Sequence, residues 1–130
     1  MKDDTLKVLQ LPISTIAYIG DAVYSLYCRV RYLDLTRVDR IHKKVNQIVS
    51  REGQARSLDK LMNSLNELEL SLVKRATNSK AAKKHGNDPL YRKSTAFETL
   101  VGFLYLSREY DRLGELIRIT LENEQNDCVR

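Results

Sequence analysis

Two acidic residues stand out because each is isolated on an otherwise apolar stretch of the chain. Glu98 is the only acid between Asp88 and Glu109, and Asp21 shares one side of a predicted helix with small or weakly polar residues. An ionised carboxylate in such surroundings is costly unless it is paired or bound to a cation. Magnesium favours one or two carboxylates together with waters and phosphate oxygens. The pattern therefore indicates that Asp21 and Glu98 could share a divalent metal ion.

Each acid is accompanied by a glycine inside a predicted helix. Gly20 precedes Asp21, and Gly102 follows Glu98 by one helical turn. A glycine in a helix costs about 1 kcal/mol relative to alanine, but its missing side chain would let another backbone or a ligand come close. The alternative is that the acids favour a helix dipole and the glycines only serve helix packing. The spacing alone is consistent with both interpretations.

The elements that must position these residues are predicted to be helices. A long helix opens near Pro12, with Ser14 as a possible N-cap, and its main apolar face follows a three- and four-residue spacing: Ile16, Ile19, Val23, Leu26 and Val30. Thr36 and Asp39 resemble a capping box before a second helix. Further helices are predicted over 58–65, from near Asn66 to 76, from near Tyr91 to 104, and over 113–121.

The 130 residues fit one domain, and no segment has the alternation of a strand. We therefore predict an all-α helical bundle over residues 1–130. Residues of about 77–90 are polar, basic and rich in turn formers, which predicts a loop. The tail from about 125 to 130 is predicted to be frayed.

Positive charge is concentrated in two segments. The chain has a formal net charge of +5, residues 29–57 carry eight Lys or Arg against three acids, and residues 74–93 carry seven against one. A polyanion is a natural partner for such an arrangement, although a solvated surface would have the same composition.

Other features restrict the compartment. No apolar run approaches the length needed to span a bilayer, and the opening residues do not resemble a signal peptide. The two cysteines, Cys28 and Cys128, form no disulfide framework, which favours a reducing compartment. We expect a cytoplasmic protein without membrane contact.

The segment 17–24, Ala-Tyr-Ile-Gly-Asp-Ala-Val-Tyr, resembles the signature of the ribonuclease III family. The segment 95–106, in which Glu98 precedes a Leu-Val-Gly run two residues on, resembles the second motif of that family. With the short length, the sequence closely resembles the Mini-ribonuclease III subfamily, which has the catalytic domain without the appended double-stranded-RNA-binding domain. The resemblance implies a helical endonuclease domain that dimerises, binds Mg²⁺ and hydrolyses phosphodiester bonds of double-stranded RNA, with precursor 23S ribosomal RNA as the implied transcript.

The resemblance also assigns residues. Asp21 falls on the catalytic aspartate of the signature and Glu98 on the catalytic glutamate of the second motif, and both would hold Mg²⁺. Ala17 stands where ribonuclease III has a glutamate, and Thr95 stands where it has an aspartate. Two of the usual four carboxylates are therefore absent, which should weaken metal binding.

A chain without a separate RNA-binding domain must contact the duplex itself, mainly at phosphates and 2′-hydroxyls. The candidates are the basic residues that flank the Glu98 helix: Lys74, Arg75, Lys80, Lys83, Lys84, His85, Arg92 and Lys93. Several tyrosines lie on apolar faces and are expected in the core or a dimer interface: Tyr18, Tyr24, Tyr27 and Tyr105.

Two other functions are open from the residues. The missing carboxylates would suit a domain that binds structured RNA without cutting it, and cleavage with Mg²⁺ present or chelated separates this from a nuclease. A helical protein-interaction module is the third possibility, and it predicts no salt-dependent RNA binding.

Overall fold

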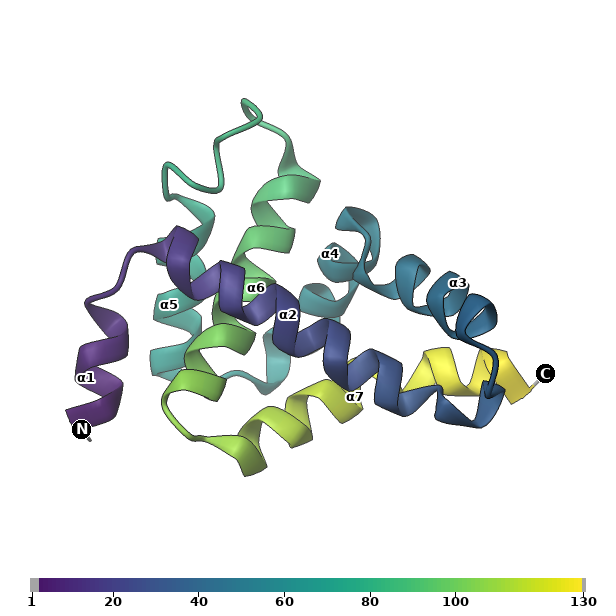
Figure 1. Ribbon diagram of the computed structural model, residues 1–130. Coiled ribbons are helices and arrows are strands. Elements are labelled where there is room, and N and C mark those ends of the chain that lie inside the picture. Colours follow the sequence, from purple (N-terminus) through teal and green to yellow (C-terminus); the bar gives the residue numbers. More distant parts are fainter. Residues whose placement is uncertain (1–2, 130) are drawn as a thin grey trace.

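The computed structural model describes the backbone of residues 3–129 and the side chains of residues 5–122. This part of the chain is helical and contains no strand, which confirms the predicted all-α class (Figure 1). The elements are α1 (Asp3–Leu9), α2 (Ile13–Arg31), the 3-10 helix η1 (Leu33–Leu35), α3 (Val38–Val49), α4 (Arg51–Leu61), the 3-10 helix η2 (Met62–Ser64), α5 (Glu67–Thr77), α6 (Pro89–Leu106) and α7 (Tyr110–Val129). Within the described range, every helix is too short or too polar to cross a membrane.

Helix α6 is the centre of the bundle, and α2, α4 and α5 all pack against it (Figure 1). Its middle is apolar or small on every side, which is typical of a buried helix. The Tyr24 ring of α2 meets the Phe97 ring of α6 edge-on, with centroids 4.6 Å apart. The Tyr24 hydroxyl lies 3.2 Å from the Ser57 hydroxyl of α4 and 3.3 Å from the Thr120 hydroxyl of α7. One tyrosine therefore connects four helices around the core.

Helices α2 and α6 cross at the two glycines. A Cβ atom added to Gly20 would lie 2.7 Å from the carbonyl carbon of Glu98 and 2.8 Å from the backbone nitrogen of Gly102. A Cβ atom added to Gly102 would in turn lie 3.0 Å from the backbone nitrogen of Gly20. Real Cβ atoms do not approach backbone this closely, so the expectation that the glycines admit another backbone is confirmed.

The buried face of α2 differs from the predicted one. Ile16 and Val23 are buried as expected, but Leu26 and Val30 are 60% and 56% exposed. The buried set is instead Ile13, Ile16, Ala17, Gly20, Val23, Tyr24 and Cys28. The close crossing at Gly20 centres the contact with α6 on that residue's side of the helix, so the far end of the predicted apolar face is turned outward.

Two predicted caps are also wrong. Helix α2 starts directly after Pro12, whose fixed φ suits a helix start, and Ser14 does not cap it. Thr36 ends η1 with a φ of 59°, and α3 begins at Val38 without a side-chain cap. Asp39 pairs instead with the Arg37 guanidinium at 3.0 Å.

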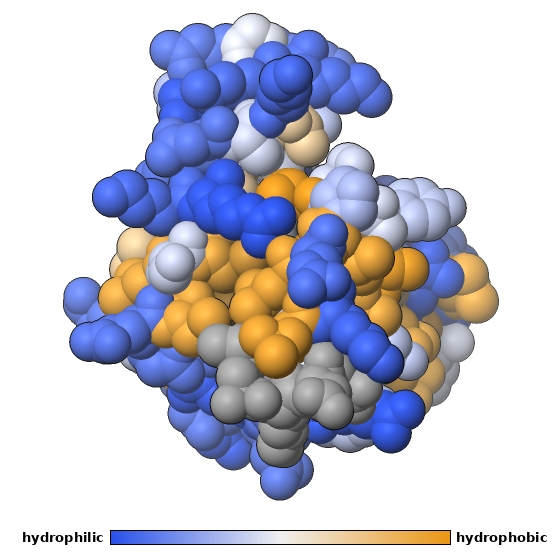
Figure 2. Space-filling model, turned by 90° about the vertical axis from the view of Figure 1, so that its left-hand side faces the viewer, coloured by the Kyte–Doolittle hydropathy of each residue, from blue (hydrophilic) through white to orange (hydrophobic). Residues whose placement is uncertain are grey.

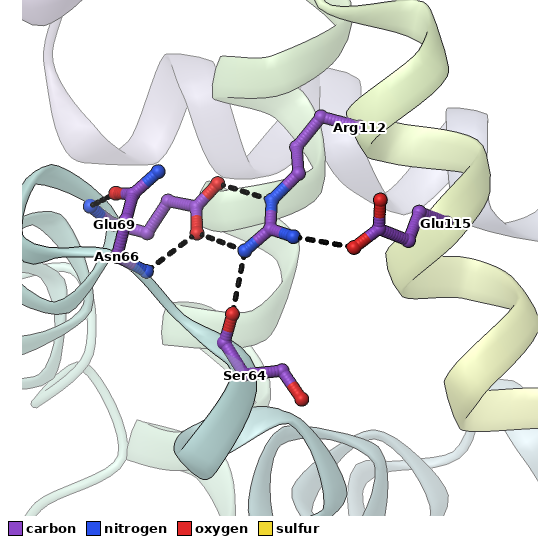
Figure 3. Close-up of polar contacts among 5 residues, drawn as sticks. All are labelled: Ser64, Asn66, Glu69, Arg112 and Glu115. Atoms are coloured by element: carbon purple, nitrogen blue, oxygen red, sulfur yellow. Dashed lines mark hydrogen bonds and ion pairs between the residues drawn. The ribbon is translucent and has the colours of Figure 1, made fainter.

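Helix α5 is fixed by a buried ion pair (Figure 3). Asn66 and Glu69 form a capping box, and the Arg112 guanidinium of α7 donates to both Glu69 carboxylate oxygens and to the Ser64 carbonyl. Burial raises the pKa of Glu69, but the hydrogen bonds from Arg112 and from the Asn66 backbone lower it by more than burial raises it. The pKa of Glu69 is therefore below its usual value. The pair therefore joins α5, η2 and α7 in one charged network.

The segment between α5 and α6, residues 78–88, forms a chain of turns where the loop of about 77–90 was predicted. It rises as a hydrophilic lobe above an apolar band when the molecule is viewed from the side of α1 and α5 (Figure 2). Ala82 within it is fully buried, which anchors the lobe to the bundle. The side chains of 123–130 lie outside the described residues, so the frayed tail of about 125–130 stays a prediction.

Candidate active site

The structure brings Asp21 and Glu98 together at one pocket. Asp21 comes from α2 and Glu98 from α6, directly beside the glycine crossing, and both carboxyl groups line the same pocket. Asp21 is exposed and Glu98 is half-buried. The pocket has a volume of about 350 Å³ and is lined by Ser14, Ala17, Tyr18, Asp21, Ala81, Lys84, Tyr91, Thr95 and Glu98.

The pKa of Glu98 is strongly perturbed in this pocket. Burial raises the pKa of Glu98, and the hydrogen bond and negative charge of Asp21 raise it further, to about 8. The Gln54 side chain of α4 acts in the opposite direction and lowers that pKa. Near neutral pH the Glu98 carboxyl is therefore mostly protonated beside the Asp21 carboxyl. A pair that resists double ionisation in this way gains from a bound cation.

The donor set of the pocket suits a hard divalent cation. Two carboxylates facing one open pocket leave room for the waters and phosphate oxygens that complete a magnesium shell. The described side chains contain no cluster of three or more His, Cys, Asp or Glu residues that could hold a metal. Asp21 and Glu98 are thus the protein ligands that this pocket offers.

The two departures from the ribonuclease III motifs lie at this same pocket. Ala17 and Thr95 both line it, one from each helix that carries an acid. The pocket therefore has places for four acidic side chains around one opening, and it holds two.

Among the eight predicted RNA contacts, Lys84 lines the pocket. Lys80, Lys83 and His85 are exposed on the same lobe, and the His85 ring meets the Tyr91 ring edge-on at 4.5 Å. Lys84 is therefore the predicted contact that reaches the pocket, and the RNA contacts of these four residues stay a prediction.

The other predicted contacts lie apart from the pocket lining. Arg92 donates to the Thr77 carbonyl and to the side chains of Asn78 and Asn87, so its guanidinium holds the two ends of the lobe together. Lys93 pairs with Asp59 of α4 at 3.0 Å.

Two basic residues of α5 complete this group. The Arg75 guanidinium donates to the Leu9 carbonyl, whereas Lys74 is exposed. The side chains of Arg92, Lys93 and Arg75 therefore already bond to oxygen atoms of the protein itself.

Several residues at the site were not predicted. Tyr18 is 78% exposed and lines the pocket, so the core interpretation of this tyrosine is wrong. Ser14 and Tyr91 also line the pocket, and a polar side chain alone does not indicate a functional residue in a sequence. Gln54 is buried in α4 beside Glu98, although a glutamine in a mostly polar segment is typical of a surface position.

Comparisons with known proteins agree with the motifs. The ribonuclease III domain model matches residues 14–109, a range that contains the whole pocket lining. A Mini-ribonuclease 3 from Kosmotoga olearia is 39% identical over 120 residues, which cover 91% of this chain and 80% of the relative. A Mini-ribonuclease 3 from Staphylococcus aureus is 36% identical over 133 residues, which cover 95% of this chain and 97% of the relative. A crystal structure of a protein from Fusobacterium nucleatum is similar with a TM-score of 0.74 at 28% identity, covering 84% of this chain and 90% of that one.

Proposed function

The chain belongs to the ribonuclease III family, with Mini-ribonuclease 3 proteins as its relatives, and we propose that it cuts double-stranded RNA in a Mg²⁺-dependent hydrolysis. Membership in this family makes the chain an endoribonuclease. The dependence on Mg²⁺ and the double-stranded substrate are what we propose. The observation that carries this proposal is the Asp21–Glu98 pair, which faces one open pocket that Lys84 also lines.

Three residues that line the pocket would have distinct parts in this reaction. Asp21 and Glu98 would hold the ion, and the Glu98 carboxyl, whose pKa is about 8, must first release its proton. Mg²⁺ in this position would activate a water molecule and offset negative charge on the scissile phosphate. Lys84, which lines the same pocket, would hold a phosphate of the substrate near the two acids. The glycine crossing keeps the acids at a fixed separation while the substrate binds.

Cleavage of a long RNA duplex with Mg²⁺, or with the metal chelated, tests this function. Asp21→Asn and Glu98→Gln should each retain the fold and duplex binding but lose on the order of a thousandfold in cleavage rate, since a bound metal contributes several kcal/mol. Near-normal cutting by either variant would refute the site. Binding without cutting by the wild-type chain would favour the non-cleaving alternative.

We propose that the lobe supplies the backbone contacts to RNA through Lys80, Lys83 and Lys84. Because Ala82 is buried, substitution to glutamine is a cleaner test than deletion of the segment. Each phosphate contact contributes about −0.9 to the log–log salt slope of duplex DNA binding, and a comparable value for RNA gives a decrease of roughly two to three units per subunit. Lys43→Gln on α3 is the control. A slope that changes only in the control would move the RNA surface to α3.

We propose that the active form is a symmetric homodimer. The support is the exposed apolar side chains at the end of α2, Leu26 and Val30, which are followed by the exposed Leu33. Such a group of side chains is unusual on a small monomeric domain. A two-fold axis near it would place two pockets so that each cuts one strand. Sedimentation should give a dimer at micromolar concentration and a monomer for Leu26→Lys; a fully active wild-type monomer would contradict the proposal.

The substrate and the compartment are also proposals. The resemblance of the two motifs to the Mini-ribonuclease III subfamily points to a duplex from precursor 23S ribosomal RNA, and the cysteine content points to the cytoplasm. Preferred cleavage of that duplex over an unrelated duplex of equal length would support the assignment. Equal rates on both would refute it.

A further inference from the structure

Tyr91 is a pocket tyrosine whose ring is held in place and whose hydroxyl is left open. The residue lies in the first turn of α6 and lines the same pocket as Thr95 and Glu98. These three positions are spaced by four and three residues, so they share one face of the helix. Tyr91 is half-buried, and its hydroxyl makes no hydrogen bond with any residue that the structure describes. The unpartnered polar atoms buried within this part of the chain do not include that oxygen, so it is open to solvent at the pocket.

Two neighbouring side chains hold the Tyr91 ring. The Arg51 guanidinium of α4 lies over the ring, 5.1 Å from its centroid, and the His85 ring of the lobe meets it edge-on at 4.5 Å. Arg51 is itself paired with the Asp88 carboxylate at 2.6 Å. The other oxygen of that carboxylate accepts a hydrogen bond from the backbone nitrogen of Tyr91 at 3.3 Å. Asp88 therefore ties the guanidinium to the helix turn that carries the ring, which gives the hydroxyl a fixed place at the pocket.

Tyr91 and Lys84 line the same pocket with different chemistry. The lysine carries a positive charge that suits a phosphate, whereas a phenol is neutral and can both donate and accept a hydrogen bond. A ribose 2′-hydroxyl has the same two capacities, and it is the group that distinguishes RNA from DNA. An A-form duplex displays these hydroxyls across its minor groove, where proteins contact them together with the phosphates. A phenol that shares a pocket with a phosphate-binding lysine therefore suits the sugar of the same duplex.

We propose that Tyr91 is a specificity-determining residue, whose fixed hydroxyl forms a hydrogen bond with a ribose 2′-hydroxyl of the duplex and so favours RNA over a duplex that lacks this group. The inference rests on the proposed function, because it requires duplex RNA to occupy the pocket. A site built to bond a substrate hydroxyl discriminates against the analogue that lacks it, since the site's own polar group is then left unpaired.

The test is Tyr91→Phe, which removes the hydroxyl and keeps the ring that Arg51 and His85 contact. Tyr110→Phe is the matched control, because Tyr110 is 51% exposed on α7 and does not line the pocket. Two duplexes of one sequence serve as substrates. One is RNA, and the other carries fluorine in place of each 2′-hydroxyl, which removes the O–H donor and keeps the A-form. The readouts are the cleavage rate with Mg²⁺ and, in an Asp21→Asn background, the dissociation constant of each duplex.

We expect Tyr91→Phe to lose roughly 3–10-fold on RNA, in cleavage rate and in affinity, which is the net effect of one hydrogen bond. On the fluorinated duplex the same substitution should cost nothing further, because the partner of the hydroxyl is already absent. Tyr110→Phe should match the parent protein on both duplexes. The melting temperature of Tyr91→Phe without substrate should equal that of the wild type, since the ring and its contacts remain.

Two results would overturn this inference. One is a Tyr91→Phe variant that cuts and binds RNA like the wild type. The other is an equal loss on both duplexes, which would indicate a phosphate contact or, with a lower melting temperature, a structural role. Failure of the proposed function is a separate result, namely a wild-type chain that does not cleave duplex RNA with Mg²⁺. The affinities in the Asp21→Asn background decide the role of Tyr91 in that case too, and absence of duplex binding would overturn both proposals.

Discussion

Replacing Gly20 with alanine tests whether the helix crossing holds the two acids together. The new Cβ atom would lie 2.7 Å from the Glu98 carbonyl carbon and closer still to its oxygen, whereas ordinary carbon–oxygen contacts are about 3.4 Å. The obstacle is backbone, so no side-chain rotation relieves it. Helices α2 and α6 must separate by about 1 Å or more, at the very residues that carry the carboxylates.

The expected effects follow from that displacement. Overpacking costs about 1–3 kcal/mol, and a backbone obstacle belongs at the upper end, while alanine regains about 1 kcal/mol of helix propensity. A net loss of about 2 kcal/mol corresponds to a decrease in melting temperature of roughly 6–10 °C for a domain of this size. A misplacement of about 1 Å can cost a hundredfold in rate, so cleavage should fall at least that far.

Gly114→Ala in α7 is the matched control, because a Cβ atom there meets nothing within 4 Å. It should gain up to about 1 kcal/mol and cleave normally. Melting by circular dichroism, and cleavage of duplex RNA well below both melting temperatures, give the two readouts. If Gly20→Ala melted and cleaved like Gly114→Ala, the glycine crossing would not position the acids.

Three further predictions concern the charged groups. The pKa of Glu98 is about 8 in the folded protein, against 4.5 for the free side chain, so its contribution to metal-free stability is fully present below pH 4.5 and is lost as the pH rises through 8. Urea titrations in chelator should show this decline in the wild type and a smaller one in Glu98→Gln. Equal pH slopes for the two proteins would contradict the prediction. Thr95→Asp restores a third carboxylate at the pocket and should lower the Mg²⁺ concentration for half-maximal cleavage; an unchanged concentration would show that this position does not reach the ion. Arg112→Met leaves Glu69 buried without its main partner and should destabilise the fold by about 3 kcal/mol in urea titrations, with kcat at 25 °C unchanged; wild-type stability would mean that the pair contributes little.

The helices and the acid pair were predictable because their signals are local or come as matched motifs. The spacing of apolar residues predicted helices α2, α5 and α6. An isolated acid near a glycine occurs in both α2 and α6, and a solvated helix surface would normally carry several charges instead. Burial was less predictable, because it depends on which partner covers a face. Leu26 is as apolar as Val23, yet only the latter faces α6. Gln54 shows the reverse error, since no local pattern marks a glutamine as buried.

Charge counting predicted a basic segment over residues 74–93 but could not say which of its cations are available to a ligand. Arg92 and Lys84 lie in the same basic segment, and the structure uses them differently. A guanidinium presents five donors in a rigid fork, so Arg92 bonds one carbonyl and two side-chain amides at once and closes the base of the lobe. An ammonium on a flexible stem fixes no such geometry, and Lys84 extends to the pocket instead. The fold therefore uses Arg92 to bond the carbonyls of this turn-rich segment, whereas Lys84 would be left, under the proposed function, for a phosphate of the substrate.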